Sequence, residues 1–340
     1  MSNGILSAHS ISALVSDKAI LSPHRALGHG QVQPASLDLR LGHKAYRLRA
    51  SFLPGKDRTI DACLDNVSMH EINLQDGAVL ETGCVYLVPL LESLSLPAHL
   101  SAAANPKSST GRLDVFTRVI CDGCSQFDAI DHGYKGPLYL EIAPRTFSIL
   151  VRTGDRLAQI RFRHGEQKIL STETVSIDLK GDGNAAIIGY RARRHSGLVD
   201  VAHVGGHAAK DYWQPIYAPD ETLILDPNEF YILVSKESVI IPANQAAEMA
   251  PIATEIGEFR AHYAGFFDPG FGTGGQGSKA VLEVRGHDVP FMLRHGQPVA
   301  KLVFEPMQST PKILYGQNGS NYQGQALRLS KHFKMQTKHA

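Results

Sequence analysis

The most constraining feature of this 340-residue chain is an internal repeat. Residues 80–98 align without gaps onto residues 225–243, at an offset of 145. Further along the chain, residues 152–162 align onto residues 294–304 at an offset of 142. A repeat on this scale indicates a duplicated structural unit, so the chain is predicted to fold as two copies of one domain. The identical pairs include Leu80 and Leu225, Tyr86 and Tyr231, Glu92 and Glu237, Gly154 and Gly296, Ala158 and Ala300, and Phe162 and Phe304.

Both copies consist of short segments of alternating apolar and polar residues, separated by Gly, Pro and Asp. This pattern is typical of β-strands, whereas helical periodicity is scarce. The expected exception is a short helix around Ser10 to Leu21, with Ser10 as its cap. The predicted fold class is therefore mainly β, with two tandem β-barrel or jelly-roll-like domains and few short helices.

We divide the chain into a first repeat (residues 1–165), a connector (residues 166–211) and a second repeat (residues 212–340). The connector is richer in charge, Gly and His than its flanks, and we expect it to include some strand. Its basic run, Arg191-Ala-Arg-Arg-His-Ser, is predicted to be a solvated surface rather than a ligand site.

Charge and hydropathy narrow the classes of partner. A net charge of +1 gives no strongly basic or acidic field, so neither nucleic acid nor a membrane is expected as a partner. No apolar run approaches the roughly 20 residues that span a bilayer, and the N-terminus lacks the pattern of a secretion signal. We therefore expect a cytoplasmic protein that binds any anion locally.

The four cysteines are too few for a disulfide framework in a chain of this size, and reduced thiols are expected. Cys121 and Cys124 have the spacing of half a zinc site or of a redox pair, with His132 close by in sequence. Because no second Cys pair follows, a plain structural role is favoured over metal binding.

A polar turn at residues 107–112 suits a polyphosphate. Lys107 and Arg112 supply positive charge, and Gly111 allows backbone amides to approach an anion closely. The hydroxyl groups come from Ser108, Ser109 and Thr110.

The strand that follows carries a carboxylate, Glu141. The strand period of two sends Leu138, Leu140 and Ile142 to one face and Tyr139 and Glu141 to the other. Glu141 is thereby free to face a pocket. A Ser-rich turn by itself usually satisfies backbone groups, and a Glu on a polar strand face is usually solvated. Only the two features together indicate a binding site.

The second copy has lost part of this set. Opposite residues 106–112 it places Pro251-Ile-Ala-Thr-Glu-Ile-Gly257, which lacks the Lys, the first Ser and the Arg. Glu283 occupies the position of Glu141 on its strand. We therefore expect one working site per chain, built around the first repeat, with the second repeat mainly supporting fold and assembly.

Three ordered motifs carry a resemblance to a known family. They are Gln33-Pro-Ala-Ser-Leu-Asp-Leu-Arg-Leu-Gly42, Lys107-Ser-Ser-Thr-Gly-Arg112, and Asp131-His-Gly-Tyr-Lys-Gly136 with Glu141 ten residues after the Asp. Together they resemble the dCTP deaminases of the dUTPase-like trimeric superfamily, in a double-length form. The resemblance covers nearly the whole chain.

The resemblance implies roles for individual residues. Glu141 would be the proton shuttle, Ser108 and Arg112 would hold the attacking water and the substrate, and residues 107–112 would line the phosphates. Asp131 would lie under the deoxyribose, with Tyr139 and Leu140 beside the base. It also implies a homotrimer with sites between subunits and a C-terminal lid, here Asn321-Tyr-Gln-Gly-Gln-Ala with Tyr322 and Gln325 over the nucleotide. The alternative for this segment is a flexible tail.

The implied reaction is hydrolytic deamination of dCTP to dUTP and ammonia, feeding dUMP and dTTP synthesis. Most base deaminases activate water with zinc, using His-x-Glu and Pro-Cys-x-x-Cys motifs. Neither motif occurs here, because Ile120 precedes the Cys pair and no His stands two residues before Glu141. No zinc is expected, whereas Mg²⁺ is expected on the triphosphate.

Three alternatives remain open at this point. The first is a dUTP pyrophosphatase or a bifunctional deaminase and pyrophosphatase, since Asp131 and its neighbours also resemble the motif in which an Asp orients water in dUTPases. The second is a non-catalytic nucleotide-binding module, and the third a purely structural trimeric barrel.

Overall fold

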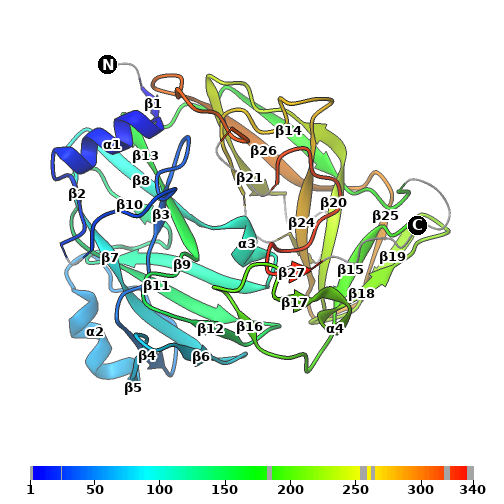
Figure 1. Ribbon diagram of the computed structural model, residues 1–340, viewed down its shortest axis with the longest axis horizontal. Coiled ribbons are helices and arrows are strands. Elements are labelled where there is room, and N and C mark those ends of the chain that lie inside the picture. The colour runs from blue at the N-terminus through cyan, green and yellow to red at the C-terminus, as the bar shows by residue number, and fades with distance from the viewer. Residues whose placement is uncertain are drawn as a thin grey trace.

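The computed structural model describes residues 3–23, 25–181, 186–252, 259–261, 265–317 and 322–334. Strands dominate this part of the chain, which confirms the predicted mainly β fold class. Figure 1 shows the first repeat, in blue to green, beside the second, in yellow to red, with α3 facing the junction between them. The helices in the described residues are α1 (Ala8–Ser16), α2 (Ile60–Val67), α3 (Ser108–Gly111) and α4 (Ala209–Tyr212).

The first repeat is built around two larger sheets. One has the order β1-β13-β8-β10 with β3 also pairing β13, and the other β5-β4-β7-β11-β9 with β2 pairing β7. A smaller sheet, β16-β12-β6, takes one strand from the connector. The strands are β1 (Gly4–Ile5), β2 (Ile20–Leu21), β3 (Leu37–Leu39), β4 (Lys44–Leu48), β5 (Ser68–Asn73), β6 (Ala78–Leu80), β7 (Val85–Ser95), β8 (Leu100–Pro106), β9 (Val115–Cys121), β10 (Ala129–Ile130), β11 (Lys135–Pro144), β12 (Ile149–Val151), β13 (Ala158–His164) and β16 (Val199–Asp200).

The second repeat has a matching pair of sheets, β14-β26-β21-β23 and β18-β15-β20-β24-β22, with β19 paired to β25 and β17 to β27. The connector supplies β14 and β15 to these sheets and β16 to the first repeat, so it contains the strand that was expected. The strands are β14 (Ser171–Ser176), β15 (Gly189–Ala192), β17 (His207–Ala208), β18 (Trp213–Ile216), β19 (Thr222–Leu225), β20 (Phe230–Val239), β21 (Gln245–Pro251), β22 (Phe259–Ala261), β23 (Phe266–Phe267), β24 (Ser278–Gly286), β25 (Phe291–Arg294), β26 (Pro298–Pro306) and β27 (Phe333–Lys334).

The repeat predicted from sequence is present in the strand registers. Glu141 pairs with Leu87, and its counterpart Glu283 pairs with Ile232, which is 145 positions after Leu87. The hydroxyl groups of Tyr86 and Tyr231 both accept a hydrogen bond from the backbone N–H five residues earlier, at 3.0 and 2.9 Å. The same side chains thus close the same turn in both copies.

Two local expectations need correction. The N-terminal helix exists but begins at Ala8 with Ser7 as its N-cap, so Ser10 lies inside it. Helix α2 was not predicted, although Thr59 is a recognisable N-cap whose side chain accepts a hydrogen bond from the backbone N–H of Ala62. Its eight residues were too short to show a clear helical period.

The basic run of the connector is largely exposed to solvent, as predicted, and two of its arginines also form ion pairs. Arg191 contacts Asp226 at 2.8 Å and Glu229 at 3.2 Å, and Arg194 contacts Glu229 at 2.5 Å. Glu229 is almost completely buried, so these arginines neutralise a carboxylate at the edge of the second repeat. None of the helices in the described residues is long and apolar enough to cross a membrane.

The C-terminal strand β27 returns to the first repeat and anchors there through aromatic rings. The Phe333 ring lies 5.2 Å from that of Tyr212, 5.7 Å from that of Trp213 and 6.1 Å from that of Phe147. Since Phe147 belongs to the first repeat, this cluster fastens the end of the chain across the junction between the repeats.

We expect Phe333→Ala to lower the free energy of unfolding by about 3 kcal/mol, because it empties a buried aromatic site. Urea unfolding followed by tryptophan fluorescence measures the change, since Trp213 lies in the cluster. Tyr217→Ala is the matched control: its ring is 53% exposed, and its loss should cost less than about 0.5 kcal/mol. Equal losses in the two variants would contradict this anchoring role.

Candidate active site

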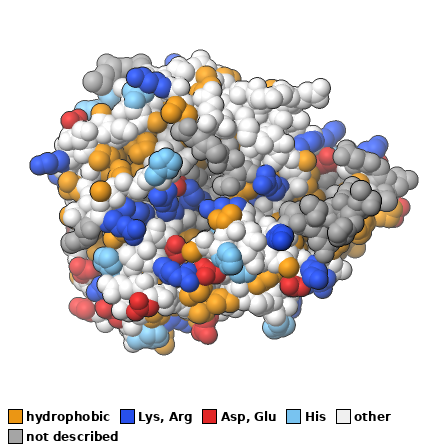
Figure 2. Space-filling model, in the orientation of Figure 1, with side chains coloured by type: hydrophobic (Ala, Val, Ile, Leu, Met, Phe, Trp, Pro, Cys, Tyr) orange, Lys and Arg blue, Asp and Glu red, His pale blue; other side chains and the backbone are white. Residues whose placement is uncertain are grey.

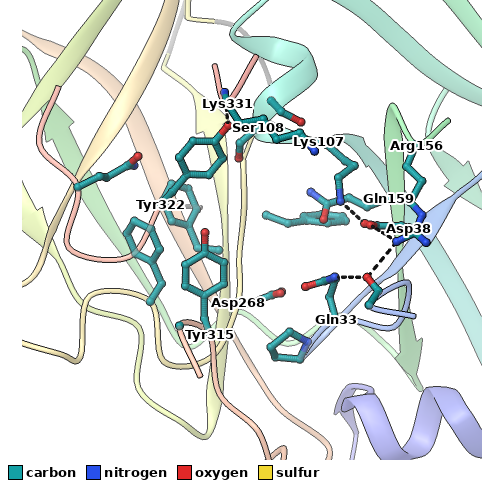
Figure 3. A pocket seen from close by; sticks show the side chains of 18 of the residues that line it. Gln33, Asp38, Lys107, Ser108, Arg156, Gln159, Asp268, Tyr315, Tyr322 and Lys331 are labelled. Atoms are coloured by element: carbon teal, nitrogen blue, oxygen red, sulfur yellow. Dashed lines mark hydrogen bonds and ion pairs between the residues drawn. The ribbon is translucent and has the colours of Figure 1, made fainter. Parts of the chain in front are cut away.

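A cavity of about 350 Å³ lies between the two repeats, a size suited to a small organic ligand. Figure 2 shows Lys and Arg side chains gathering across the middle of this face of the molecule, over the junction of the repeats. In Figure 3, Lys107, Asp38 and Arg156 lie on one side of the cavity, and Tyr315 and Tyr322 lie on the other. Both repeats and the C-terminal segment therefore contribute walls.

The first wall is the predicted polar turn at residues 107–112. The backbone of Lys107 is extended, and its carbonyl accepts hydrogen bonds from the N–H groups of Thr110 and Gly111, so the chain makes one helical turn, α3. Lys107, Ser108, Ser109 and Arg112 line the cavity. Thr110 and Gly111 are buried in the turn and are not among the lining residues.

Asp38 organises the cations of this wall. Its carboxylate pairs with Lys107 and lies 3.6 Å from Nη1 of Arg156. Asp38 is 2% exposed, so the two basic groups face a buried negative charge. Such pairing holds both cations in defined positions without cancelling the net positive charge of the wall.

The second wall comes from the second repeat. Glu283 and Val281 project from β24, and Asp268 follows β23 in a turn. Glu283 and Asp268 are both nearly buried. Burial raises the pKa of Asp268, and the positive charges of Arg161 and Lys107 oppose that shift.

Arg112 joins the two walls. Its Nε lies 4.0 Å from a carboxylate oxygen of Glu283, and its Nη2 donates to the side-chain oxygen of Gln325 at 3.0 Å. Its Nη1 donates to the carbonyl of Arg328 at 3.0 Å, and its guanidinium lies 3.9 Å from the ring centre of Tyr322. The guanidinium is thus held in one orientation by four separate contacts.

The C-terminal segment, residues 322–334, lines the rest of the cavity with Tyr322, Gln325 and Lys331. The Ser330 hydroxyl donates to the carbonyl of Ser109 at 2.7 Å, which ties the segment to the polar turn. Burial lowers the pKa of Lys331, and the nearby positive charge of Lys107 lowers it further. Tyr322 and Gln325, from the predicted lid, therefore lie at the cavity between the repeats, beside the polar turn; Asn321 is outside the described residues.

Glu141 is not among the residues that line this cavity, contrary to the sequence-based expectation. Its carboxylate pairs with Arg118, whose Nε donates to it at 2.9 Å. Arg118 in turn donates to Ser51 at 2.7 Å, and Tyr139, from the same strand face, donates to Asp61 at 3.2 Å. Residues 51–61 thus contact the strand face on which the pocket was expected.

The remaining predicted residues of that strand region also lie elsewhere. Leu140 is in the hydrophobic core, and Asp131 is exposed in a turn. Their counterparts 142 positions later are in part the residues found in the cavity, because Tyr139 matches Val281 and Glu141 matches Glu283. Asp268 holds the corresponding place to Asp131 at the start of its Gly-containing turn.

The cavity therefore takes its polar turn and Asp38 from the first repeat, and Glu283 and Asp268 from the second. The repeat alignment could have identified Glu283, because the second copy keeps this Glu although it has lost the Lys, the first Ser and the Arg of the polar turn. The lost turn of the second copy falls largely on residues 253–258, outside the described part of the chain. Asp38, Arg156 and Gln159 were not named as site residues, although Asp38 lies within a motif that was recognised.

Cys121 and Cys124 are both buried and unoxidised. The hydrogen bond between the two thiols raises the pKa of Cys121, and burial raises it further. The same hydrogen bond lowers the pKa of Cys124 to about 7. Among the residues that the structure describes, no group of three or more His, Cys, Asp or Glu side chains is placed to hold a metal ion.

Known proteins resemble this chain in sequence and in structure. A crystal structure of 2'-deoxycytidine 5'-triphosphate deaminase from Agrobacterium tumefaciens is 53% identical, with a TM-score of 0.88, and the match covers 92% of this chain and 100% of that one. The dCTP deaminase of Natronomonas pharaonis is 30% identical over 137 residues, which are 39% of this chain and 66% of the relative.

A further relative is the "dCTP deaminase, dUMP-forming" of Corynebacterium glutamicum, 34% identical over 115 residues, 33% of this chain and 56% of the relative. The chain thus spans less than two thirds of the length of these curated relatives. Two family models match in tandem: the N-terminal domain of 2'-deoxycytidine 5'-triphosphate deaminase over residues 2–166, and its C-terminal domain over residues 153–333. The chain therefore belongs to the 2'-deoxycytidine 5'-triphosphate deaminase family, as its motifs predicted.

Proposed function

We propose that this protein hydrolyses dCTP to dUTP and ammonia in the cavity between its repeats, with Glu283 as the proton shuttle. The observation that carries the proposal is the approach of Glu283 to Arg112, at 4.0 Å, in a cavity that Ser108 also lines. Glu283 replaces Glu141 in this role, because the Glu141 carboxylate is engaged by Arg118 outside the cavity.

The reaction needs a water to attack C4 of cytosine, a proton to reach N3, and the amine to leave as ammonia. Glu283 takes one proton of the attacking water and delivers it to N3. It then takes the second proton, from the hydroxyl now on C4, and delivers it to the amine, which leaves as ammonia while the C4 carbonyl forms. Ser108 holds the water, and Arg112 stabilises the charge that develops on its oxygen. The contacts of Arg112 with Gln325 and Tyr322 support this assignment, because they fix the guanidinium before the substrate binds.

The triphosphate is assigned to the basic wall. Lys107, Arg156 and Lys331 all line the cavity, and the hydroxyls and N–H groups of α3 add hydrogen-bond donors. Burial and Lys107 lower the pKa of Lys331, so its charged form has the most stabilisation to gain from a bound phosphate. Asp268 takes the place that the sequence assigned to Asp131 and accepts a hydrogen bond from the deoxyribose.

Mg²⁺ is proposed to arrive with the triphosphate. It prefers phosphate oxygens together with one or two carboxylates, and Asp38 is the carboxylate beside Lys107 on the basic wall. This donor set fits an ion held mainly by the nucleotide, whose contribution is to neutralise phosphate charge. Water activation is assigned to Glu283, Ser108 and Arg112 without zinc.

Both repeats of one chain supply the walls named here. The homotrimer, the cytoplasmic location and the supply of dUMP for dTTP synthesis remain predictions from sequence. Among the alternatives, combined deamination and pyrophosphate release is favoured by one observation, the match to relatives named dUMP-forming.

Product analysis tests the function directly. We expect purified protein to release ammonia from dCTP in step with dUTP, with dCMP turned over at least about tenfold less efficiently, because dCMP lacks two of the phosphates assigned to the basic wall. Chromatography of the nucleotides separates the outcomes. Pyrophosphate together with dUMP would establish the bifunctional reaction, and nucleotide binding without turnover would contradict an enzyme.

A matched pair of substitutions tests the choice of acid. Glu283→Gln should lower kcat by about 10²-fold or more, since it removes the proton acceptor and keeps the shape of the side chain. Glu141→Gln, made at the equivalent position of the other repeat, should leave kcat within about twofold for the folded fraction, because its effect is confined to stability. The reverse pattern would restore the original assignment to Glu141.

Metal removal tests the cofactor proposal. EDTA should abolish most of the activity, because the triphosphate then lacks its counter-ion, and added Mg²⁺ should restore it. A zinc chelator in excess Mg²⁺ should leave the rate unchanged. Stoichiometric zinc in the purified protein, with activity lost on its removal, would overturn the zinc-independent mechanism.

A further inference from the structure

Arg161 is a buried arginine that reaches from the first repeat into the wall of the second. It lies on β13 and is 3% exposed. Its Nη1 donates to the carbonyl of Ala247 at 3.1 Å, and its Nη2 donates to the carbonyl of Phe267 at 3.3 Å and to Oδ1 of Asp268 at 3.1 Å. Its guanidinium also lies 4.1 Å from the ring centre of Phe266.

These contacts fix the position of Asp268 and place a positive charge beside its carboxylate. Arg161 holds the carbonyl of Phe267 and the side chain of Asp268 together, so the turn that carries the carboxylate cannot rotate independently. Burial raises the pKa of Asp268, and Asp38 raises it further, whereas Arg161 and Lys107 lower it. Arg161 therefore favours the ionised carboxylate, which only accepts hydrogen bonds, over the protonated form, which donates one.

Arg161 has no basic counterpart in the second repeat, where the equivalent position is Val303. It does not line the cavity, and its hydrogen bonds go to Ala247, Phe267 and Asp268 of the second repeat. Its position is therefore explained by the carboxylate that it holds. Neighbouring Arg163 crosses the same junction, but it pairs with Glu305 at 2.8 and 2.9 Å, away from the cavity lining.

We propose that Arg161 is a positioning residue that holds Asp268 as a fixed, charged acceptor for the 3'-hydroxyl of the nucleotide sugar. This inference rests on the proposed function and adds a determinant of sugar selectivity. It assigns to the interface between the repeats a role in recognition as well as in assembly. A hydrogen bond to a charged acceptor is worth about 10-fold to 100-fold in selectivity when the partner hydroxyl is removed.

The test compares dCTP with its 2',3'-dideoxy analogue, which lacks that hydroxyl. In the unmodified protein, kcat/KM for dCTP should exceed that for the analogue by about 10-fold to 100-fold. In Arg161→Met this ratio should fall below about threefold, through a loss on dCTP rather than a gain on the analogue. Arg163→Met removes a cation from the same interface and should keep the full ratio, whatever its effect on stability.

Two further variants separate the possible outcomes. Arg161→Lys keeps the charge and loses the forked geometry, so it should give an intermediate ratio and serves if Arg161→Met does not fold. Asp268→Asn should remove the ratio by itself. If Asp268→Asn removes it and both Arg161 variants keep it, the inference about Arg161 is wrong while the proposed site stands. If Asp268→Asn keeps the full ratio of dCTP to the analogue, Asp268 does not bind the sugar. If Glu283→Gln also remains active, the proposed function fails as well.

Discussion

The structure depends on the burial of arginines from the first repeat against acceptors of the second. Arg112 and Arg161 are each 3% exposed, and within the described part of the chain their side chains contact residues of the second repeat across the junction. A buried guanidinium is tolerated when carboxylates and carbonyls satisfy it in a defined geometry. The two barrels are therefore oriented by directional hydrogen bonds as well as by apolar packing, and the cavity inherits that precision.

Duplication has produced two copies with one strand register and different chemistry. Leu282 pairs with Leu233 as Leu140 pairs with Val88, so the backbones of the two central ladders correspond. The acids that they carry have different surroundings. Glu283 approaches Arg112 at the cavity, whereas Glu141 is paired with Arg118 beneath residues 51–61, which include part of α2. One strand position thus holds a buried glutamate in each repeat, which lines the cavity in the second repeat and pairs with Arg118 in the first.

The C-terminal segment completes the site and stabilises it. Phe333 is fastened among Phe147, Tyr212 and Trp213, and the preceding residues carry Lys331, Gln325 and Tyr322 to the cavity. The aromatic cluster holds the far end of the segment. Near its start, the side-chain amide of Gln325 donates to the carbonyl of Lys279 on β24 at 3.1 Å, so the segment is held at both ends. Orientation before substrate binding lowers the entropic cost of catalysis.

The sequence by itself determined the mainly β fold, the duplication, the family and the polar turn at residues 107–112, because strand period, repeat offset and motif spacing are all local properties of the chain. It also indicated that the C-terminal Tyr322 and Gln325 belong beside the polar turn. Which glutamate meets Arg112 was decided only by tertiary structure. Glu141 and Glu283 lie in the same strand pattern, so the sequence does not distinguish them. Their environments differ through contacts between residues more than 100 positions apart, such as Arg112 with Glu283. Such contacts depend on how the two repeats dock and not on any local preference.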